Sequence, residues 1–112
     1  SATVVNGVSY ISSVMADGVS GDDLRKIAID LRSSAPKSVV ALISSNDGKP
    51  VLVVATSDGA REVGVKAGAL VKIGSTILGG GGGGKDDFAQ GGGTDASKSL
   101  DALNAISNAL AG

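Results

Sequence analysis

The sequence contains neither cysteine nor histidine, and its only aromatic residues are Tyr10 and Phe88. Without cysteine and histidine the chain has no disulfide, no thiol nucleophile, no imidazole base and neither of the commonest zinc ligands. Most catalytic arrangements are therefore excluded. Because aromatics are scarce, the core must be built from valine, isoleucine, leucine and alanine.

Long hydrophobic runs and an excess of one charge are also missing. The longest apolar run, Val51 to Ala55, is far too short to span a membrane, and the N-terminus has no signal-peptide pattern. The net charge is -1, so any contact with nucleic acid would have to come from a local basic patch. We expect a cytoplasmic chain without membrane contact, and its abrupt start at Ser1 is compatible with a piece of a longer protein.

The length of 112 residues and a hydrophobic content of 42% predict a single globular domain over residues 1–112. β-branched and aromatic residues roughly alternate from Val8 to Met15, which predicts a strand. A helix should follow, with Ser20 as its N-cap and Pro36 at its end. The next two apolar segments, SVVALIS and PVLVVAT, flank an Asp-Gly pair and predict a hairpin of central strands.

Helical spacing returns in the second half of the chain, from Val65 to Leu78 and from about Ser97 to Leu110. Asp95 or Ser97 would cap the last helix. The positions expected to face the core are Ala67, Leu70, Val71, Gly74, Ile77 and Leu78 in the first of these helices, and Leu100, Leu103, Ile106, Ser107 and Leu110 in the second. The predicted fold is α/β (α+β), a small mixed β-sheet with helices packed on it and a glycine-rich loop between the last two helices.

Residues 78–93, LGGGGGGKDDFAQGGG, hold nine of the eighteen glycines. Such a run is often a flexible linker, but this one joins two helices of one small domain and ends in a specific KDDFAQ segment. Its formal matches to a dinucleotide-binding motif and to a P-loop are rejected. The segment follows a helix rather than a strand, and Asp86 stands where a P-loop needs serine or threonine. The DFAQ segment is expected to form a short edge strand, because Phe88 needs somewhere to pack.

Glycine has no Cβ, so several backbone N–H groups can converge on one anionic oxygen or on a sugar edge. We predict such an anion nest here, with Lys85 supplying charge for a phosphate and Gln90 an amide for a base edge or a ribose hydroxyl. Asp86 and Asp87 oppose this prediction, and an ion pair between Lys85 and either of them is the alternative.

Basic charge gathers before the glycine run. Between residues 60 and 85 only Glu62 opposes four cations, Arg61, Lys66, Lys72 and Lys85. On the first helix the charges are balanced, which is typical of an ordinary solvated face formed by Arg25, Lys26, Arg32 and Lys37 with Asp22, Asp23 and Asp30. The sequence therefore predicts that any basic patch lies around the glycines.

The segment GGGGGGKDDFAQGGG, preceded by a helix ending in ILGG and followed by a final amphipathic helix, resembles the closing segment of bacterial alanyl-tRNA synthetases. The likeness is to their globular C-terminal domain, C-Ala, which is related to the DHH-associated domain of phosphoesterases. It covers essentially the whole chain, including LVVATSDGAREVGVKAGALVK. It implies a small α/β domain that a helical connector joins to the aminoacylation and editing domains of a longer synthetase.

The resemblance implies a domain that binds the elbow of tRNA(Ala) and does not catalyse. Its partners would be tRNA(Ala) and the parent's other domains, and it would hold no cofactor, because ATP, magnesium and zinc would belong to those domains. The residues that it assigns to nucleic-acid binding are Gly79, Gly80, Gly81, Gly82, Gly83, Gly84, Lys85 and Gln90, with Arg61, Lys66 and Lys72 as weaker candidates. The chain departs from the commoner family pattern at Asp86, where proline is frequent, and at Gly91, where alanine is.

Two other functions stay open. Exposed apolar helix faces or an open strand edge near Phe88 would allow a homodimer or docking on the parent. The domain could also recognise the substrate of a DHH-family phosphoesterase. In that branch a histidine usually ends the glycine motif, whereas this chain has Lys85, which favours the synthetase branch.

Overall fold

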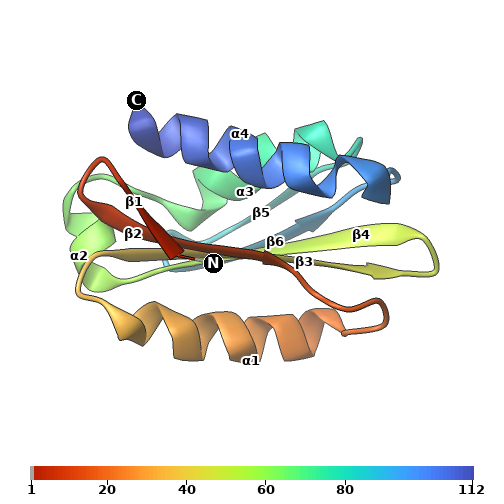
Figure 1. Cartoon of the computed structure of the whole chain (residues 1–112), viewed down its shortest axis with the longest axis horizontal. Helices are drawn as coiled ribbons and strands as arrows, with labels where there is room; N and C mark the ends of the chain where they lie inside the picture. The colour runs from red at the N-terminus through yellow and green to blue at the C-terminus, as the bar shows by residue number, and fades with distance from the viewer. Residues whose placement is uncertain (1) are drawn as a thin grey trace.

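The computed structural model describes residues 2–112 and has one mixed β-sheet between two layers of helices (Figure 1). The order of strands across the sheet is β1-β2-β3-β4-β6-β5. These strands are β1 (Ala2–Val5), β2 (Val8–Val14), β3 (Ser38–Asn46), β4 (Lys49–Thr56), β5 (Gly82–Gly84) and β6 (Phe88–Gly92). Strands β2 and β3 are parallel, and the other pairs are antiparallel. The predicted mixed sheet with packed helices is confirmed.

The helices cover both faces of the sheet. Helix α1 (Gly21–Leu31) lies on one face, and α3 (Ala67–Ile77) and α4 (Ser99–Ala111) lie on the other (Figure 1). Shorter turns complete the chain: α2 (Asp58–Glu62), η1 (Arg32–Ser34) and η2 (Ala96–Lys98). Because α1 is the crossover between two parallel strands, it has to pack back onto the sheet.

The central hairpin has apolar side chains on both of its faces. Val40 and Leu42 of β3 pack toward α1, whereas Val39, Ala41 and Ile43 pack toward α3 and α4. All five are at most 1% exposed. A strand covered on both faces has no polar side, which explains the nearly continuous apolar runs of its sequence.

Local signals in the sequence predicted several boundaries correctly. The Ser20 hydroxyl accepts a hydrogen bond from the Asp23 N–H (3.1 Å) and caps α1 as expected. Asp47 and Gly48 both have positive φ, 53° and 77°, so that Asn46 pairs with Lys49 across a two-residue turn. This is the turn geometry that an Asp-Gly pair favours, because both central residues need φ above zero.

Two of the positions predicted to face the core are wrong. Leu100 is 67% exposed and Ile77 is 39% exposed. In α4 the buried positions include the small residues Ser99 and Ala102, so the helix presents a neighbouring stripe to the sheet. Small side chains let a helix approach closely, and Leu100 is left on the outer side.

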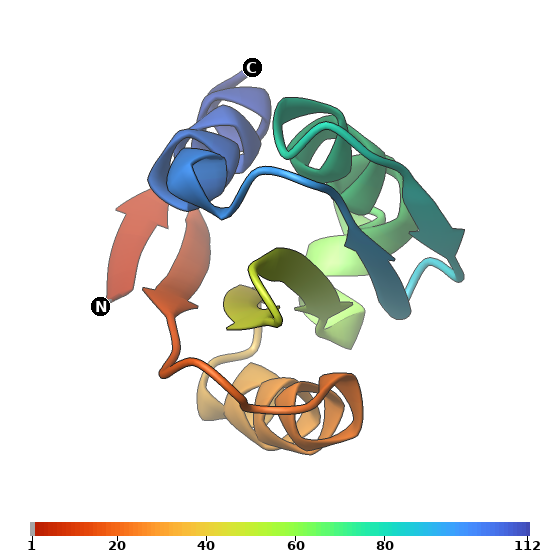
Figure 2. The ribbon, with the colours of Figure 1, turned by 90° about the vertical axis from the view of Figure 1, so that its right-hand side faces the viewer.

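Other elements differ from the prediction. Strand β1 and helix α2 were not predicted, and Ser1 lies outside the described residues. The DFAQ segment is part of β6, but β6 is not an edge strand, because it pairs with β4 on one side and β5 on the other. The edge is the polyglycine strand β5, which stands at the side of the sheet away from the N-terminal strands (Figure 2).

Candidate functional site

The glycine run forms one arm of an antiparallel hairpin rather than a loop. Gly82, Gly83 and Gly84 pair with Gly91, Gln90 and Ala89 of β6. Among the six consecutive glycines only Gly79 and Gly84 have positive φ, so the middle of the run is extended. The predicted nest of converging N–H groups is wrong for this middle part, because an extended strand turns successive N–H groups to opposite sides.

Alternate glycines in β5 are required by packing. A Cβ on Gly82 would lie 2.4 Å from the Gly91 Cα, and one on Gly84 would lie 2.7 Å from the Ala89 Cα. A Cβ on Gly91 would meet the Ser75 hydroxyl oxygen of α3 at 2.1 Å. Gly82 and Gly84 thus let β5 lie close to β6, and Gly91 lets the hairpin lie close to α3.

Two glycines of the run, Gly81 and Gly83, are not required by packing. A Cβ on Gly81 or Gly83 would meet nothing within 4 Å, and neither residue has positive φ. Gly83 pairs with Gln90, whose side chain lies against Gly21 of α1, so both residues face the α1 side of the sheet. The fold would accept a side chain at Gly81 and at Gly83, but both residues are glycine and their backbone is exposed.

The outer edge of β5 also offers hydrogen-bonding groups. Lys85 N–H donates to the Phe88 carbonyl (3.0 Å) and the Gly81 carbonyl accepts from Gly92 N–H (3.2 Å). Alternation along the ladder therefore turns the N–H and C=O groups of Gly82 and Gly84 away from β6. The Gly84 carbonyl lies near Gly68 of α3, where a Cβ would be 3.1 Å from it, and the groups of Gly82 point to the open edge. An extended row of donors and acceptors without side chains is suited to phosphate oxygens and ribose hydroxyls.

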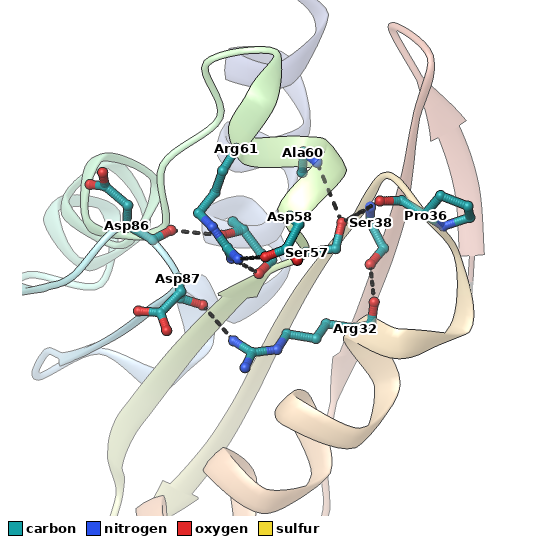
Figure 3. Close-up of polar contacts among 10 residues, drawn as sticks. Arg32, Pro36, Ser38, Ser57, Asp58, Ala60, Arg61, Asp86 and Asp87 are labelled. Carbon is teal, nitrogen blue, oxygen red and sulfur yellow. Dashed lines mark hydrogen bonds and ion pairs between the residues drawn. The ribbon is translucent and has the colours of Figure 1, made fainter.

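The turn between β5 and β6 is held in place by its backbone carbonyls. The Lys85 carbonyl accepts from Gly68 N–H (3.1 Å), and the Asp86 carbonyl accepts from Ala67 N–H (2.9 Å) and the Thr56 hydroxyl (2.6 Å). The Asp87 carbonyl accepts from Thr56 N–H (3.0 Å). It also accepts from the Arg32 guanidinium (3.0 Å; Figure 3).

These contacts involve α3, β4 and the end of α1, and they leave the side chains of the turn free to contact a ligand. In particular, Lys85 is exposed, and within residues 2–112 it does not form the ion pair with Asp86 or Asp87 that was the alternative to anion binding. The ammonium group of Lys85 is therefore free to bind an external anion.

A groove of about 400 Å³ lies between α1 and the hairpin, on the side that Gly83 faces. Cationic side chains of Arg25, Arg32 and Lys85 line it together with one carboxylate, Asp87. The Arg25 guanidinium carbon lies 4.8 Å from the centre of the Phe88 ring. The sequence analysis placed Arg25 and Arg32 on an ordinary solvated helix face, and it missed that they border the glycine hairpin.

The three weaker candidates lie in different places. Arg61 is committed within the fold, because its guanidinium donates to the Thr56 carbonyl and pairs with Asp58 (Figure 3). Lys66 stands immediately before α3, next to Ala67, whose N–H binds the turn. Lys72 is exposed one helical turn after Gly68, which contacts that turn, so both lysines stand on the α3 side of the hairpin.

A larger groove, of about 800 Å³, lies elsewhere, beside the turn between β3 and β4. It is lined by Asp17 and Asp47 and by no basic residue. Its carboxylates would repel a phosphate, so its size does not make it the better candidate for nucleic acid. Within residues 2–112 there is no group of three or more potential metal ligands, and no helix there has the length and apolar character needed to span a membrane.

The model of the DHHA1 domain family matches residues 7–112. Alanine–tRNA ligase from Paenarthrobacter aurescens is 50% identical over 107 residues, and the ligase from Streptomyces avermitilis is 43% identical over 109 residues. These alignments cover 94% and 95% of this chain. The chain spans 12% of the length of each ligase.

Two solved structures have the same fold. The C-Ala domain from Aquifex aeolicus alanyl-tRNA synthetase superposes with a TM-score of 0.93 at 29% identity, over 100% of this chain and 99% of that domain. RecJ from Thermus thermophilus superposes with a TM-score of 0.64 at 14% identity, over 91% of this chain and 14% of RecJ, which is a likeness of fold alone. The predicted resemblance is confirmed, and the chain belongs to the DHHA1 domain family as a relative of the C-Ala domain of alanyl-tRNA synthetases.

Proposed function

We propose that this chain is the tRNA-binding domain of an alanyl-tRNA synthetase and that its glycine hairpin binds the elbow of tRNA(Ala). The observation that carries the proposal is the bare, exposed backbone at Gly81 and Gly83, which the fold does not require, beside the free cation of Lys85. Structured RNA is recognised largely through its shape, its phosphates and its 2′-hydroxyls. Backbone donors and lysines are suited to this mode of binding, which does not depend on many aromatic side chains.

The relatives named alanine–tRNA ligase support a longer parent protein with ATP-dependent alanine–tRNA ligase activity. In this proposal the present chain binds and does not catalyse, while ATP, magnesium and zinc belong to other domains of the parent. By holding the elbow, the domain would keep one acceptor end within reach of both aminoacylation and editing. Its partners are tRNA(Ala) and those domains, in the cytoplasm.

The test is a titration of the chain with a tRNA(Ala) transcript in gel-shift assays over a range of salt concentrations. If the hairpin contacts phosphates, log K falls linearly with log salt, and Lys85→Gln reduces the slope by roughly 0.7 to 0.9. Lys49→Gln is the matched control, because Lys49 is exposed beside Asp47 at the acidic groove, which we do not expect to touch RNA. A salt profile that is flat, or a slope that changes equally in both variants, would refute the assignment.

A second function is favoured by the unpaired edge of β5. Free N–H and C=O groups at an exposed edge allow two copies to join their sheets, or allow docking on another domain of the parent. Sedimentation of the chain at high concentration decides between a monomer and a homodimer. The third alternative, substrate recognition in a DHH-family phosphoesterase, is supported by a likeness of fold to proteins such as RecJ.

A further inference from the structure

Arg25 and Phe88 form a stacked pair on the wall of the groove beside the glycine hairpin. Phe88 is half-buried and packs against the core under α1, whereas Arg25 is exposed. The guanidinium carbon lies 4.8 Å from the centre of the ring, which is cation–π distance. Within residues 2–112 this stack is the one polar or ionic contact of Arg25, so its N–H groups remain available.

The position of this guanidinium is informative because another partner is close in sequence. Asp22 precedes Arg25 by three residues on the same helix, a spacing at which an ion pair forms readily. No such ion pair is made, and the guanidinium carbon instead lies over the Phe88 ring, 4.8 Å from its centre. Arg25 is exposed there, so the side of the guanidinium away from the ring is open to a ligand.

Groups suited to an RNA backbone surround this exposed plane. Lys85, Gln90 and the open side of Gly83 line the same groove as Arg25 and Phe88. The Gln90 amide lies against Gly21 at the start of α1, where a Cβ would be 2.7 Å from its nitrogen. The groove therefore combines the cation of Lys85, the amide donor and acceptor of Gln90, and the Arg25–Phe88 pair.

We propose that the Arg25–Phe88 stack is a nucleobase-binding site, on which the exposed face of one RNA base stacks while Lys85 and the bare backbone at Gly83 hold the neighbouring phosphate. Unpaired bases in RNA stack on aromatic rings and on arginine guanidinium planes, and stacking is compatible with any base because each has a π face. This inference rests on the proposed RNA-binding function and adds to it that α1 contributes to the interface. The ligand class is RNA with an exposed base next to its phosphate.

The test separates stacking from charge. Arg25→Lys keeps the positive charge and removes the planar group, so we expect tRNA(Ala) affinity to fall about fivefold or more with an unchanged salt slope. Lys26→Gln is the control, because Lys26 is the next exposed residue on α1 and does not line the groove. In the double variant, Arg25→Lys should lower the affinity for tRNA(Ala) by the same factor in the Lys26→Gln background as in the wild-type chain.

A second measurement uses a short single-stranded oligoribonucleotide as probe. Phe88 is the only phenylalanine, so its ring signals are unambiguous in NMR spectra and should shift on titration, together with the Arg25 Nε–H. If tRNA(Ala) binds, but Arg25→Lys leaves affinity unchanged and the Phe88 signals do not move, the nucleobase site is wrong and the proposed function stands. If the oligonucleotide shifts Phe88 and tRNA(Ala) does not bind, the nucleobase site stands and the proposed function is wrong.

Discussion

Replacing two neighbouring glycines of β5 by alanine should change the free energy of unfolding in opposite directions. In Gly83→Ala the new methyl group would enter open space on the α1 side, since nothing lies within 4 Å. In Gly82→Ala it would lie 2.4 Å from the Gly91 Cα and 2.7 Å from the Gln90 carbonyl oxygen. Both obstacles are backbone atoms of β6, which is itself paired with β4, so neither can move aside without disrupting the sheet.

The magnitudes follow from two separate effects. Replacing glycine by alanine where the conformation permits it raises the free energy of unfolding by about 0.4–1 kcal/mol, because the unfolded chain loses freedom. Overpacking at Gly82 lowers the free energy of unfolding by about 1–3 kcal/mol. The two variants should therefore differ by about 1.4–4 kcal/mol in the free energy of unfolding, and a difference of about 2 kcal/mol corresponds to about 8 °C in Tm.

Thermal unfolding followed by far-UV circular dichroism, with urea unfolding alongside, measures this difference. Gly83→Ala should melt at or above the wild-type temperature and Gly82→Ala well below it. Gly83→Ala should nevertheless weaken tRNA(Ala) binding, because the methyl group would cover backbone that we place in the interface. If both variants lost stability equally, the reasoning from Cβ contacts would be refuted.

Two further predictions concern the scaffold. Ser20→Ala should lower the free energy of unfolding by about 1 kcal/mol in urea titrations, because it removes the hydroxyl that accepts from Asp23 N–H; an unchanged midpoint would contradict this cap. Burial raises the pKa of the Tyr10 hydroxyl, which donates to the Leu103 carbonyl (2.8 Å). The contribution of the protonated Tyr10 to the stability of the fold is therefore complete below the unfolded pKa of about 10, and it is lost at higher pH. Tyr10 is the only tyrosine, and its phenolate absorbance should appear only as the chain unfolds; ionisation of the native chain at the ordinary pKa would disprove the effect of burial.

Signals that act over a few residues were readable in the sequence. The Ser20 cap depends on an N–H three residues away, and the Asp47-Gly48 turn depends on its own backbone angles. The buried face of α4 was harder to predict from the sequence, because a hydrophobic pattern selects Leu100 as buried and does not select Ser99 and Ala102. Which of them is buried depends on how closely α4 approaches α3 and the sheet, which helical periodicity does not specify.

The sequence indicated the glycines and Lys85 as candidates, but it did not indicate the groove beside them. A polyglycine strand has no alternation of side chains, so its extended form follows only from pairing with β6. Arg25 was judged by the charge balance of its own helix, whereas its actual neighbour is Phe88, far along the chain. Side-chain chemistry contributed by a distant strand leaves no periodic signal in a single sequence.

The carbonyl anchors of the hairpin turn have a thermodynamic consequence for the rest of the domain. Because the Lys85 and Asp86 carbonyls accept the N–H groups of Gly68 and Ala67, the turn cannot open while those two bonds of the first turn of α3 persist. We therefore expect the two segments to open together as one cooperative unit. A ligand that binds only the closed hairpin will therefore also stabilise the start of α3, which it does not contact. The increase in the free energy of opening depends on the ligand's concentration and dissociation constant.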